Sequence, residues 1–278
     1  MAELNSILIV GCGNMGGAML AGWLAGGFDP ARFTIFDPHL AAAPAGVRLL
    51  RALPAGPFDA ILLGVKPQAL GQVAPQLAVL AGAGTVLLSV LAGVELVSLR
   101  QRFPHAAAIV RVMPNLAAAL GKSPVALAGF GLAGCALADP QRAALTRLMQ
   151  PLGTPEWFAD DQQFDLLTAL VGSGPAFVYR LVEALGAGAA ALGMEPAQAS
   201  RLAIAMVEGA AALAAAAAAT ADASPAELAR RVTSPGGTTA AGLAVLDQNQ
   251  ALSALIEATL HAAQTRGAEL AAAARAGA

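Results

Sequence analysis

The chain has 278 residues, of which 57% are hydrophobic and only 12% are charged. Because so few charges can hardly cover a monomer, we expect a large apolar interface between subunits. The net charge of −2 and the lack of any run of lysine or arginine argue against nucleic acid and anionic membranes as partners.

The first part of the chain predicts alternating strands and helices. Continuous apolar runs predict strands at 7–10, 33–37, 59–65, 84–90 and 107–112, and the pattern allows later strands at 124–128 and 155–158. A helix is expected from about Met15 to Ala25, and Gly26-Gly27 would end it. Strands this apolar are typical of a parallel sheet that helices cover on both faces.

After about residue 160 the pattern changes to alanine-rich helices. We expect helices at roughly 161–192, 196–219, 226–232, 237–246 and 249–274. Ser224 and Pro225, with Glu227 three residues after the serine, form the capping box that starts one of them. The sequence therefore predicts an α/β fold with a Rossmann dinucleotide-binding domain at 1–159 and an all-α domain at 160–278.

The amino terminus and the cysteines bear on location. Residues 1–5 lack the basic region of a secretory signal, and the apolar stretches 85–94 and 210–219 are too short or too rich in alanine to suggest a membrane span. Cys12 and Cys135 stand far apart without a CxxC partner, so we expect neither a disulfide framework nor a zinc site, and no metal. A reducing, cytoplasmic location fits these features best.

A glycine-rich turn, Gly11-Cys12-Gly13-Asn14-Met15-Gly16, lies between the first strand and the first helix. In a G-x-G-x-x-G turn the first glycine permits the tight bend, the second lets the backbone approach a pyrophosphate, and the third allows close packing of strand and helix. The helix amino terminus adds N–H donors and positive potential. In this context the turn predicts a dinucleotide-binding site rather than a structural turn.

Asp37 ends the second strand, at about the spacing of the acid that binds the ribose 2′-hydroxyl. A carboxylate there would repel a 2′-phosphate, so Asp37 favours NADH over NADPH. Alternatively, Asp37 only opens a turn before Pro38, and Arg32, His39 or Arg48 could receive a phosphate.

Three further strand ends should face the same crevice. Lys66 follows the third strand in the sequence Gly64-Val65-Lys66-Pro67, although a solvated surface lysine would explain it equally well. Residues 90–93 end the fourth strand. Asn115 follows the fifth strand, and its amide could pair with the nicotinamide carboxamide or instead cap the next helix.

Helix-breaking residues interrupt the segment 168–177. Gly172, Gly174 and Pro175 each oppose a regular helix, so we expect a kinked or broken backbone there. The kink serves either packing alone or the exposure of backbone to cofactor and substrate.

A second glycine turn lies in the segment 232–243, VTSPGGTTAAGL. Its glycines place bare N–H groups at the start of a helix, with the hydroxyls of Ser234 and Thr239 beside them. The segment predicts either a site for a substrate carboxylate or a well-capped corner between two helices.

The sequence resembles the pyrroline-5-carboxylate reductases across essentially its whole length. It carries ILIVGCGNMGGAML, GVKPQ, RVMPN and GSGPAF in the order in which that family has them, and residues 225–247 match the family's characteristic signature. The resemblance implies the reduction of pyrroline-5-carboxylate to proline by NAD(P)H, in a homodimer interlocked through the helical domain that can assemble further into rings. Asp37 departs from the serine, threonine or arginine-type site of many NADPH-using members, so NADH stays favoured.

The resemblance also assigns roles by position. The residues implied to line the cofactor are Gly11, Cys12, Gly13, Asn14, Met15, Gly16, Val65, Lys66, Pro67 and Ala92, with Asn115, Thr168 and Pro175 near the nicotinamide. Those implied to hold the substrate carboxylate are Ser234, Gly237 and Thr238, and Thr239 is implied to reach the ring nitrogen as the one catalytic side chain.

Two other functions compete with this interpretation. Hydroxy-acid reductases of the same two-domain plan generally use a lysine in the helical domain, but neither Lys66 nor Lys122 lies in residues 160–278. A nucleotide-binding paralogue without turnover would not need the intact TSPGGTT segment.

Overall fold

The computed structural model describes residues 4–159 and 161–276. It divides into two compact units. The first, called here the sheet unit, contains the described residues up to Gly172 and those from His261 onward, and the second, the helical unit, is Ser173–Leu260. This division differs from a boundary at 159/160 because the segment after residue 160 packs against the sheet, where Phe164, Leu167 and Val171 join its core. A functional boundary at 159/160 stays a prediction.

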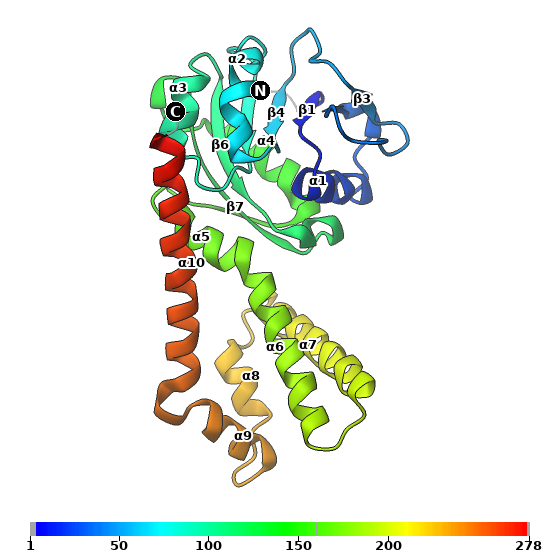
Figure 1. The fold of residues 1–278 in the computed structure, drawn as a ribbon, viewed down its shortest axis with the longest axis vertical. Coiled ribbons are helices and arrows are strands. Elements are labelled where there is room, and N and C mark those ends of the chain that lie inside the picture. Colours follow the sequence, from blue (N-terminus) through cyan, green and yellow to red (C-terminus); the bar gives the residue numbers. More distant parts are fainter. Residues whose placement is uncertain (1–3, 160, 277–278) are drawn as a thin grey trace. The chain divides into compact units, whose positions relative to one another are not determined.

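An eight-stranded sheet organises the sheet unit (Figure 1). Its strands are β1 (Ile7–Val10), β2 (Phe33–Phe36), β3 (Arg48–Leu50), β4 (Ala60–Leu63), β5 (Val86–Ser89), β6 (Ala108–Met113), β7 (Ser123–Gly131) and β8 (Gly153–Trp157). They lie in the order β3-β2-β1-β4-β5-β6-β7-β8, and every neighbouring pair is parallel except β6 and β7. The chain order reverses between β1 and β4, which is the switch point of a Rossmann fold. The predicted α/β fold is confirmed.

Helices cover both faces of this sheet. One core contains residues of α1 (Asn14–Ala25), the 3₁₀ turn η3 (Leu116–Leu120) and α4 (Asp139–Met149). The other contains residues of α2 (Leu70–Ala78), α3 (Leu96–Arg102) and α5 (Phe164–Leu167). The strands β1 and β4 to β6 are buried at every position, as expected of a sheet covered on both sides.

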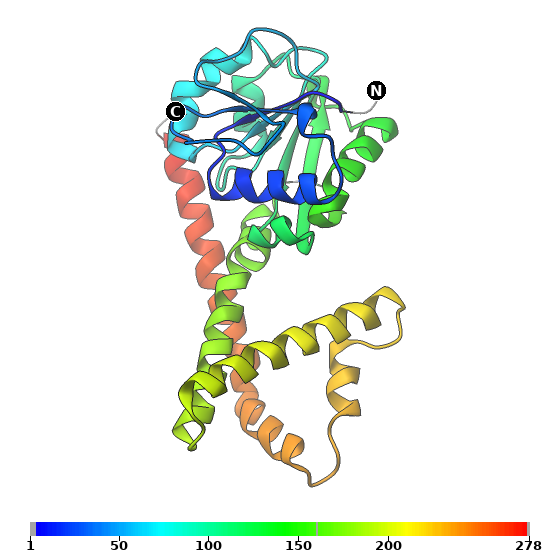
Figure 2. The same cartoon turned by 90° about the vertical axis from the view of Figure 1, so that its right-hand side faces the viewer.

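The helical unit is built from α6 (Gly174–Ala191), α7 (Pro196–Ala219), α8 (Pro225–Arg231), α9 (Thr238–Leu246) and the first part of α10 (Ala251–Ala276). The helices α6 and α7 lie against each other, crossing as Figure 2 shows. Their backbones approach closely because Gly186 has no side chain, and a Cβ there would lie 3.3 Å from Ser200 Cα. The predicted helices in this part of the chain are confirmed.

Large apolar side chains of the helical unit are exposed. They include Leu181, Leu192, Ile204 and Leu213, whose exposed fractions run from 54% to 92%. The helices α8 and α9 bury no residue at all. A unit that leaves so much apolar surface uncovered needs a partner surface. By length and composition α7, which contains the stretch 210–219, could also cross a membrane, so the expectation that this stretch is too short or too rich in alanine does not hold for the helix.

Candidate cofactor and substrate sites

The predicted glycine turn lies directly after β1, at the switch point of the sheet. Gly11 has φ +83°, and a Cβ there would lie 2.9 Å from the Val65 backbone nitrogen, so only glycine fits. A Cβ on Gly16 would lie 2.8 Å from the Gly11 carbonyl oxygen. These two glycines therefore bring β1, α1 and the end of β4 together.

Gly13 differs from the other two because nothing lies within 4 Å of a Cβ built on it. It is the N-cap residue of α1, and no side chain caps the helix there. The N–H groups of the first turn, which belong to Asn14, Met15 and Gly16, thus have neither a capping side chain nor an acidic neighbour. Free space and uncapped donors at a helix amino terminus fit a pyrophosphate.

Asp37 follows β2 and its carboxylate is held by three backbone N–H groups. Oδ2 accepts from Cys12 N–H at 2.9 Å, and Oδ1 accepts from His39 at 2.8 Å and Leu40 at 3.1 Å. Partial burial acts to raise the pKa of Asp37, but these donors outweigh it and hold the pKa below its ordinary value. A carboxylate has about four acceptor positions, so one remains for a ribose hydroxyl.

The hydrogen bond from the Cys12 N–H group joins the glycine turn to Asp37, so Asp37 does more than open the turn before Pro38. Burial, with a smaller contribution from Asp37, raises the pKa of the Cys12 thiol to about 11. The thiol is therefore protonated at neutral pH and lacks the nucleophilic form.

The cations around Asp37 are arranged differently from the sequence interpretation. Arg32 donates to the carbonyl of Leu4 and covers the Phe28 ring, and so it faces away from the strand ends. Arg51 is not among the cations that the sequence pointed to, yet its guanidinium donates to the carbonyl oxygens of Asp37 at 2.8 Å and Ala41 at 3.3 Å. The short strand β3 brings Arg51 there, and a three-residue strand leaves too weak a pattern to predict.

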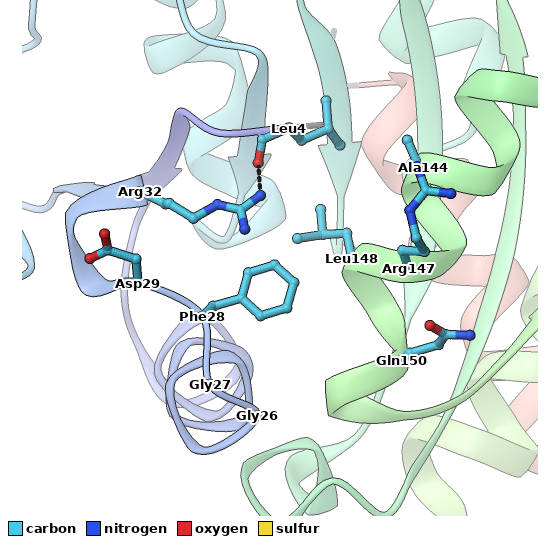
Figure 3. A pocket seen from close by; sticks show the side chains of 10 residues that line it. All are labelled: Leu4, Gly26, Gly27, Phe28, Asp29, Arg32, Ala144, Arg147, Leu148 and Gln150. Carbon is cyan, nitrogen blue, oxygen red and sulfur yellow. Dashed lines mark hydrogen bonds between the residues drawn. The ribbon is translucent and has the colours of Figure 1, made fainter. Parts of the chain in front are cut away.

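Arg32 lines a cavity of about 520 Å³ (Figure 3). It lies between the loop after α1 and the helix α4, and its lining includes Phe28, Arg147 and Leu148. Gly26 and Gly27 place it at the carboxyl end of α1. A 12-residue helix is about 18 Å long, so the cavity lies far from the glycine turn and is not part of the dinucleotide crevice.

The ends of β4 and β5 lie beside the glycine turn in the sheet order. A Cβ on Gly64 would lie 2.4 Å from the Gly11 carbonyl oxygen. The backbone of Gly64 and Val65 therefore packs directly against the glycine turn. Lys66 is exposed and precedes the 3₁₀ turn that Pro67 opens. Ala92 is exposed after β5. These positions border the crevice from the side of β4 and β5.

Asn115 follows β6 and is buried. Its Oδ1 accepts from Ala117 N–H at 2.9 Å, so it caps the turn η3, and its Nδ2 donates to the Val171 carbonyl at 3.2 Å. The amide oxygen of Asn115 therefore caps the turn, as one of the two predictions for this residue expected. One amide hydrogen beyond the bond to Val171 remains for another acceptor.

The expected kink in segment 168–177 is a π-helix, Thr168–Ser173, which joins α5 to α6. Thr168 Oγ1 donates to the Phe164 carbonyl at 2.7 Å and lies 4.0 Å from Met113 Sδ. Pro175 occupies the first turn of α6, where its missing N–H costs no helical hydrogen bond. Short π-helical stretches are frequent at functional sites.

The second glycine turn lies in the helical unit, before α9. Pro235 follows Ser234, Gly236 has φ +70°, and Gly237 N–H donates to the Ser234 carbonyl at 3.0 Å, which is the pattern of a type II turn. Gly237 is the N-cap residue of α9, and no side chain caps it.

The helix α9 therefore begins with free donors. Thr238 is exposed and Thr239 is half-buried. Within the described part of the chain, neither threonine hydroxyl has a hydrogen-bond partner. Uncapped N–H groups beside two free hydroxyls can receive a carboxylate.

Comparison with known proteins shows the pyrroline-5-carboxylate reductase family. A family model for pyrroline-5-carboxylate reductase dimerisation matches residues 161–270. The chain is 34% identical to a pyrroline-5-carboxylate reductase of Pseudomonas aeruginosa over 272 residues, which cover 95% of this chain and 96% of the relative.

Solved structures are also similar. A pyrroline-5-carboxylate reductase from Coxiella burnetii has 28% identity and a TM-score of 0.84, and covers 96% of this chain and 99% of its own. The Plasmodium falciparum pyrroline carboxylate reductase, solved with NADP bound, has 20% identity and a TM-score of 0.77, with coverage of 97% and 100%. At 20% identity, the similarity to the Plasmodium falciparum protein shows a shared fold only.

Proposed function

The chain belongs to the pyrroline-5-carboxylate reductase family, and we propose on this basis how its residues carry out the family's reaction. It is an NAD(P)H-dependent reductase that converts pyrroline-5-carboxylate to proline, the last step of proline biosynthesis. The observation that carries the proposal is a pair of glycine turns, each followed by a helix whose amino terminus no side chain caps. One suits a pyrophosphate and the other a ring carboxylate.

In the cofactor site, the N–H groups of the first α1 turn bind the pyrophosphate, and the open space at Gly13 admits it. Val65, Lys66, Pro67 and Ala92 border the dinucleotide at the ends of β4 and β5. By the family resemblance, Asn115 and Thr168 in the sheet unit and Pro175 in the helical unit are assigned to the nicotinamide. When bound, the reduced nicotinamide supplies the hydride.

We further propose that NADH is preferred over NADPH. Asp37 is ionised at neutral pH because its three N–H donors lower its pKa, and it retains one acceptor position for a ribose hydroxyl. The same charge repels a 2′-phosphate. Arg51 partly offsets this repulsion, so NADPH also serves as a donor.

In the substrate site, Ser234, Gly237 and Thr238 hold the carboxylate at the start of α9. The Thr239 hydroxyl binds the ring nitrogen. A cyclic imine is basic enough to be reduced in its protonated form, so the site needs no strongly acidic side chain. The task of the chain is to fix the ring at a reactive distance from the cofactor, about 3–3.5 Å.

The two half-sites work together in an assembly. The carboxy-terminal region is a dimerisation domain, and we propose that the exposed apolar surfaces of α6 and α7 are covered by a second copy rather than by lipid. Dimers then assemble further into rings. We place the enzyme in the cytoplasm, without nucleic-acid or membrane partners.

The first experiment measures the oxidation of NADH and of NADPH with pyrroline-5-carboxylate, and identifies proline as the product. The proposal expects turnover with both cofactors and a higher kcat/KM with NADH. Absence of substrate-dependent oxidation with either cofactor would reject the proposed function.

The second experiment tests Thr239. We expect Thr239→Ala to lower kcat/KM by about 10²–10³-fold if its hydrogen bond acts mainly in the transition state. Thr233→Ala is the matched control, because that hydroxyl donates to the Ala229 carbonyl within the preceding helix. An unchanged kcat/KM in Thr239→Ala removes its proposed role.

A further inference from the structure

A charged side chain is buried inside the sheet unit. Arg111 lies in β6, where its side chain is 3% exposed, and its guanidinium pairs with Asp161 and covers the Phe164 ring at 4.3 Å from the centroid. One of its nitrogens, Nη2, is buried without a hydrogen-bond partner. A buried ion pair is often no more stable than apolar side chains of the same volume. This pair therefore needs another reason for being present.

The carboxylate of Asp161 has two partners. Oδ1 binds Arg111, and Oδ2 accepts from the Leu96 N–H at 2.7 Å. Leu96 is the first residue of α3, the helix that follows the loop containing Ala92 and Gly93. A carboxylate at that position satisfies a free N–H group and favours the positive end of the helix. Asp161 thus joins β6 to the end of the loop after β5.

The same strand is tied to the next helical segment at regular intervals. Met113 Sδ is 4.0 Å from Thr168 Oγ1, and Asn115 Nδ2 donates to the Val171 carbonyl. Residues 111, 113 and 115 lie on one side of an extended chain, which advances about 6.6 Å for every two residues. Of their partners, Asp161 precedes α5, and Phe164, Thr168 and Val171 lie three or four residues apart in α5 and the π-helix. The segment is therefore fixed along β6 at three successive points.

Two of the three residues assigned to the nicotinamide, Asn115 and Thr168, belong to the elements joined in this way, and so does Ala92, which is assigned to the dinucleotide. Ala92 precedes α3, Asn115 follows β6, and Thr168 begins the π-helix. The Arg111–Asp161 pair is the one charged contact in this set of ties, and it reaches both α3 and the start of the α5 segment. Every group in the set lies in the sheet unit.

We propose that Arg111 and Asp161 are positioning residues for the nicotinamide half of the cofactor site. They touch neither cofactor nor substrate, and they fix the relative positions of the Ala92 loop, Asn115 and Thr168. This inference rests on the proposed function, since it takes Asn115 and Thr168 as nicotinamide surroundings and Ala92 as part of the cofactor site. A displacement of about 1 Å in such surroundings can lower the rate about 10²-fold.

The test compares Asp161→Asn and Arg111→Lys with Arg100→Met as the matched control. Arg100 is also a partly buried arginine on an aromatic ring, Phe130, but it donates to the carbonyls of Phe103, Pro104, Ala106 and Gly131, near the amino end of β6. For each variant, Tm, the Kd values of ADP-ribose and NADH, and kcat are measured in the full-length protein. ADP-ribose contains the adenosine and pyrophosphate without the nicotinamide.

In both test variants we expect ADP-ribose to bind within about twofold of wild type, while the extra affinity contributed by the nicotinamide falls and kcat drops by about 10–100-fold. Arg100→Met should lower Tm without changing kcat or the ratio of the two Kd values. An unchanged Kd ratio and kcat in Asp161→Asn overturns the proposal, as does a loss of kcat that follows Tm in all three variants.

Two further outcomes are informative. If Asp161→Asn does not fold, Arg111→Lys and Asp161→Glu retain both charges and change only the geometry, and the same criteria apply to them. If the wild type binds NADH but does not reduce pyrroline-5-carboxylate, the proposed function fails. The Kd ratio needs no turnover and still decides whether the pair positions the nicotinamide half.

Discussion

Replacing Asp37 by asparagine separates the two tasks assigned to this carboxylate. In Asp37→Asn the amide oxygen can still accept from His39 and Leu40, but the amide nitrogen would face the Cys12 N–H, donor against donor. A hydrogen bond to a charged group contributes about 1.5–3 kcal/mol. Because Asp37 is partly exposed, we take the lower end, which corresponds to about tenfold in affinity.

The glycine turn loses its anchor for either cofactor, whereas the ribose contact is lost only for NADH. We therefore expect kcat/KM with NADH to fall by about 10–100-fold and kcat/KM with NADPH by about tenfold at most, since repulsion of the 2′-phosphate is relieved. Initial rates at saturating pyrroline-5-carboxylate, with each cofactor varied, measure both values. Preference for NADPH in the wild type, or an unchanged ratio in the variant, refutes the reasoning.

Asp59→Asn is the control for stability. Asp59 Oδ2 accepts from the N–H groups of Asn5 and Ser6, at the opposite end of the strands, so this change should leave the cofactor ratio alone. A second readout uses pH. The pKa of Asp37 is lower in the folded protein than its ordinary value of 3.8. The ionised carboxylate therefore stabilises the fold at pH values above 3.8, and this stabilisation is lost as the pH falls through the pKa of the folded state. The Tm difference between wild type and Asp37→Asn should therefore shrink below about pH 4.

Three further sets of substitutions test other features of the structure. Gly13→Ala should raise KM for the cofactor by about tenfold or more with little change in Tm, because its Cβ meets no protein atom, whereas Gly16→Ala should lower Tm. Arg51→Ala should lower kcat/KM with NADPH several-fold more than with NADH, and equal effects would reject its role. Gly186→Ala should lower Tm or leave it unchanged, whereas Gly188→Ala, whose Cβ has free space, should raise the free energy of unfolding by the usual helical preference of about 1 kcal/mol, and Tm with it.

The sequence predicts the parts of the fold whose pattern is local. The strands β1, β2 and β4 to β6 are mostly apolar runs, and the helix over 196–219 agrees in both of its ends with α7. The sequence analysis predicts no helix at α2, α3 or α4. Pro75 lies inside α2, and α3 has only seven residues, so the pattern of these two helices is weak. The strand β3 has three residues, and the antiparallel course of β7 depends on a turn that no residue pattern announced.

Among site residues, local chemistry could be predicted and long-range partners could not. The uncapped helix starts behind Gly13 and Gly237 follow from glycine turns that the sequence displays. The contact of Arg51 with Asp37 needs the pairing of β2 with β3, and Arg32 faces the cavity instead of the crevice. A signal for Arg111 did exist, because a single charge inside an apolar strand has to find a buried partner.

Few titrating side chains are available to this reaction, so catalysis depends mainly on how the fold positions the cofactor and the substrate. The donors expected to bind pyrophosphate and carboxylate are backbone N–H groups, whose positions depend on how α1 and α9 are held. The positions of the groups proposed to surround the nicotinamide depend in turn on the contacts between β6 and the segment 161–171. Substitutions at such buried ties should therefore reduce kcat as much as the loss of one hydrogen-bonding side chain in the site, because both displace the reacting atoms rather than alter their acidity.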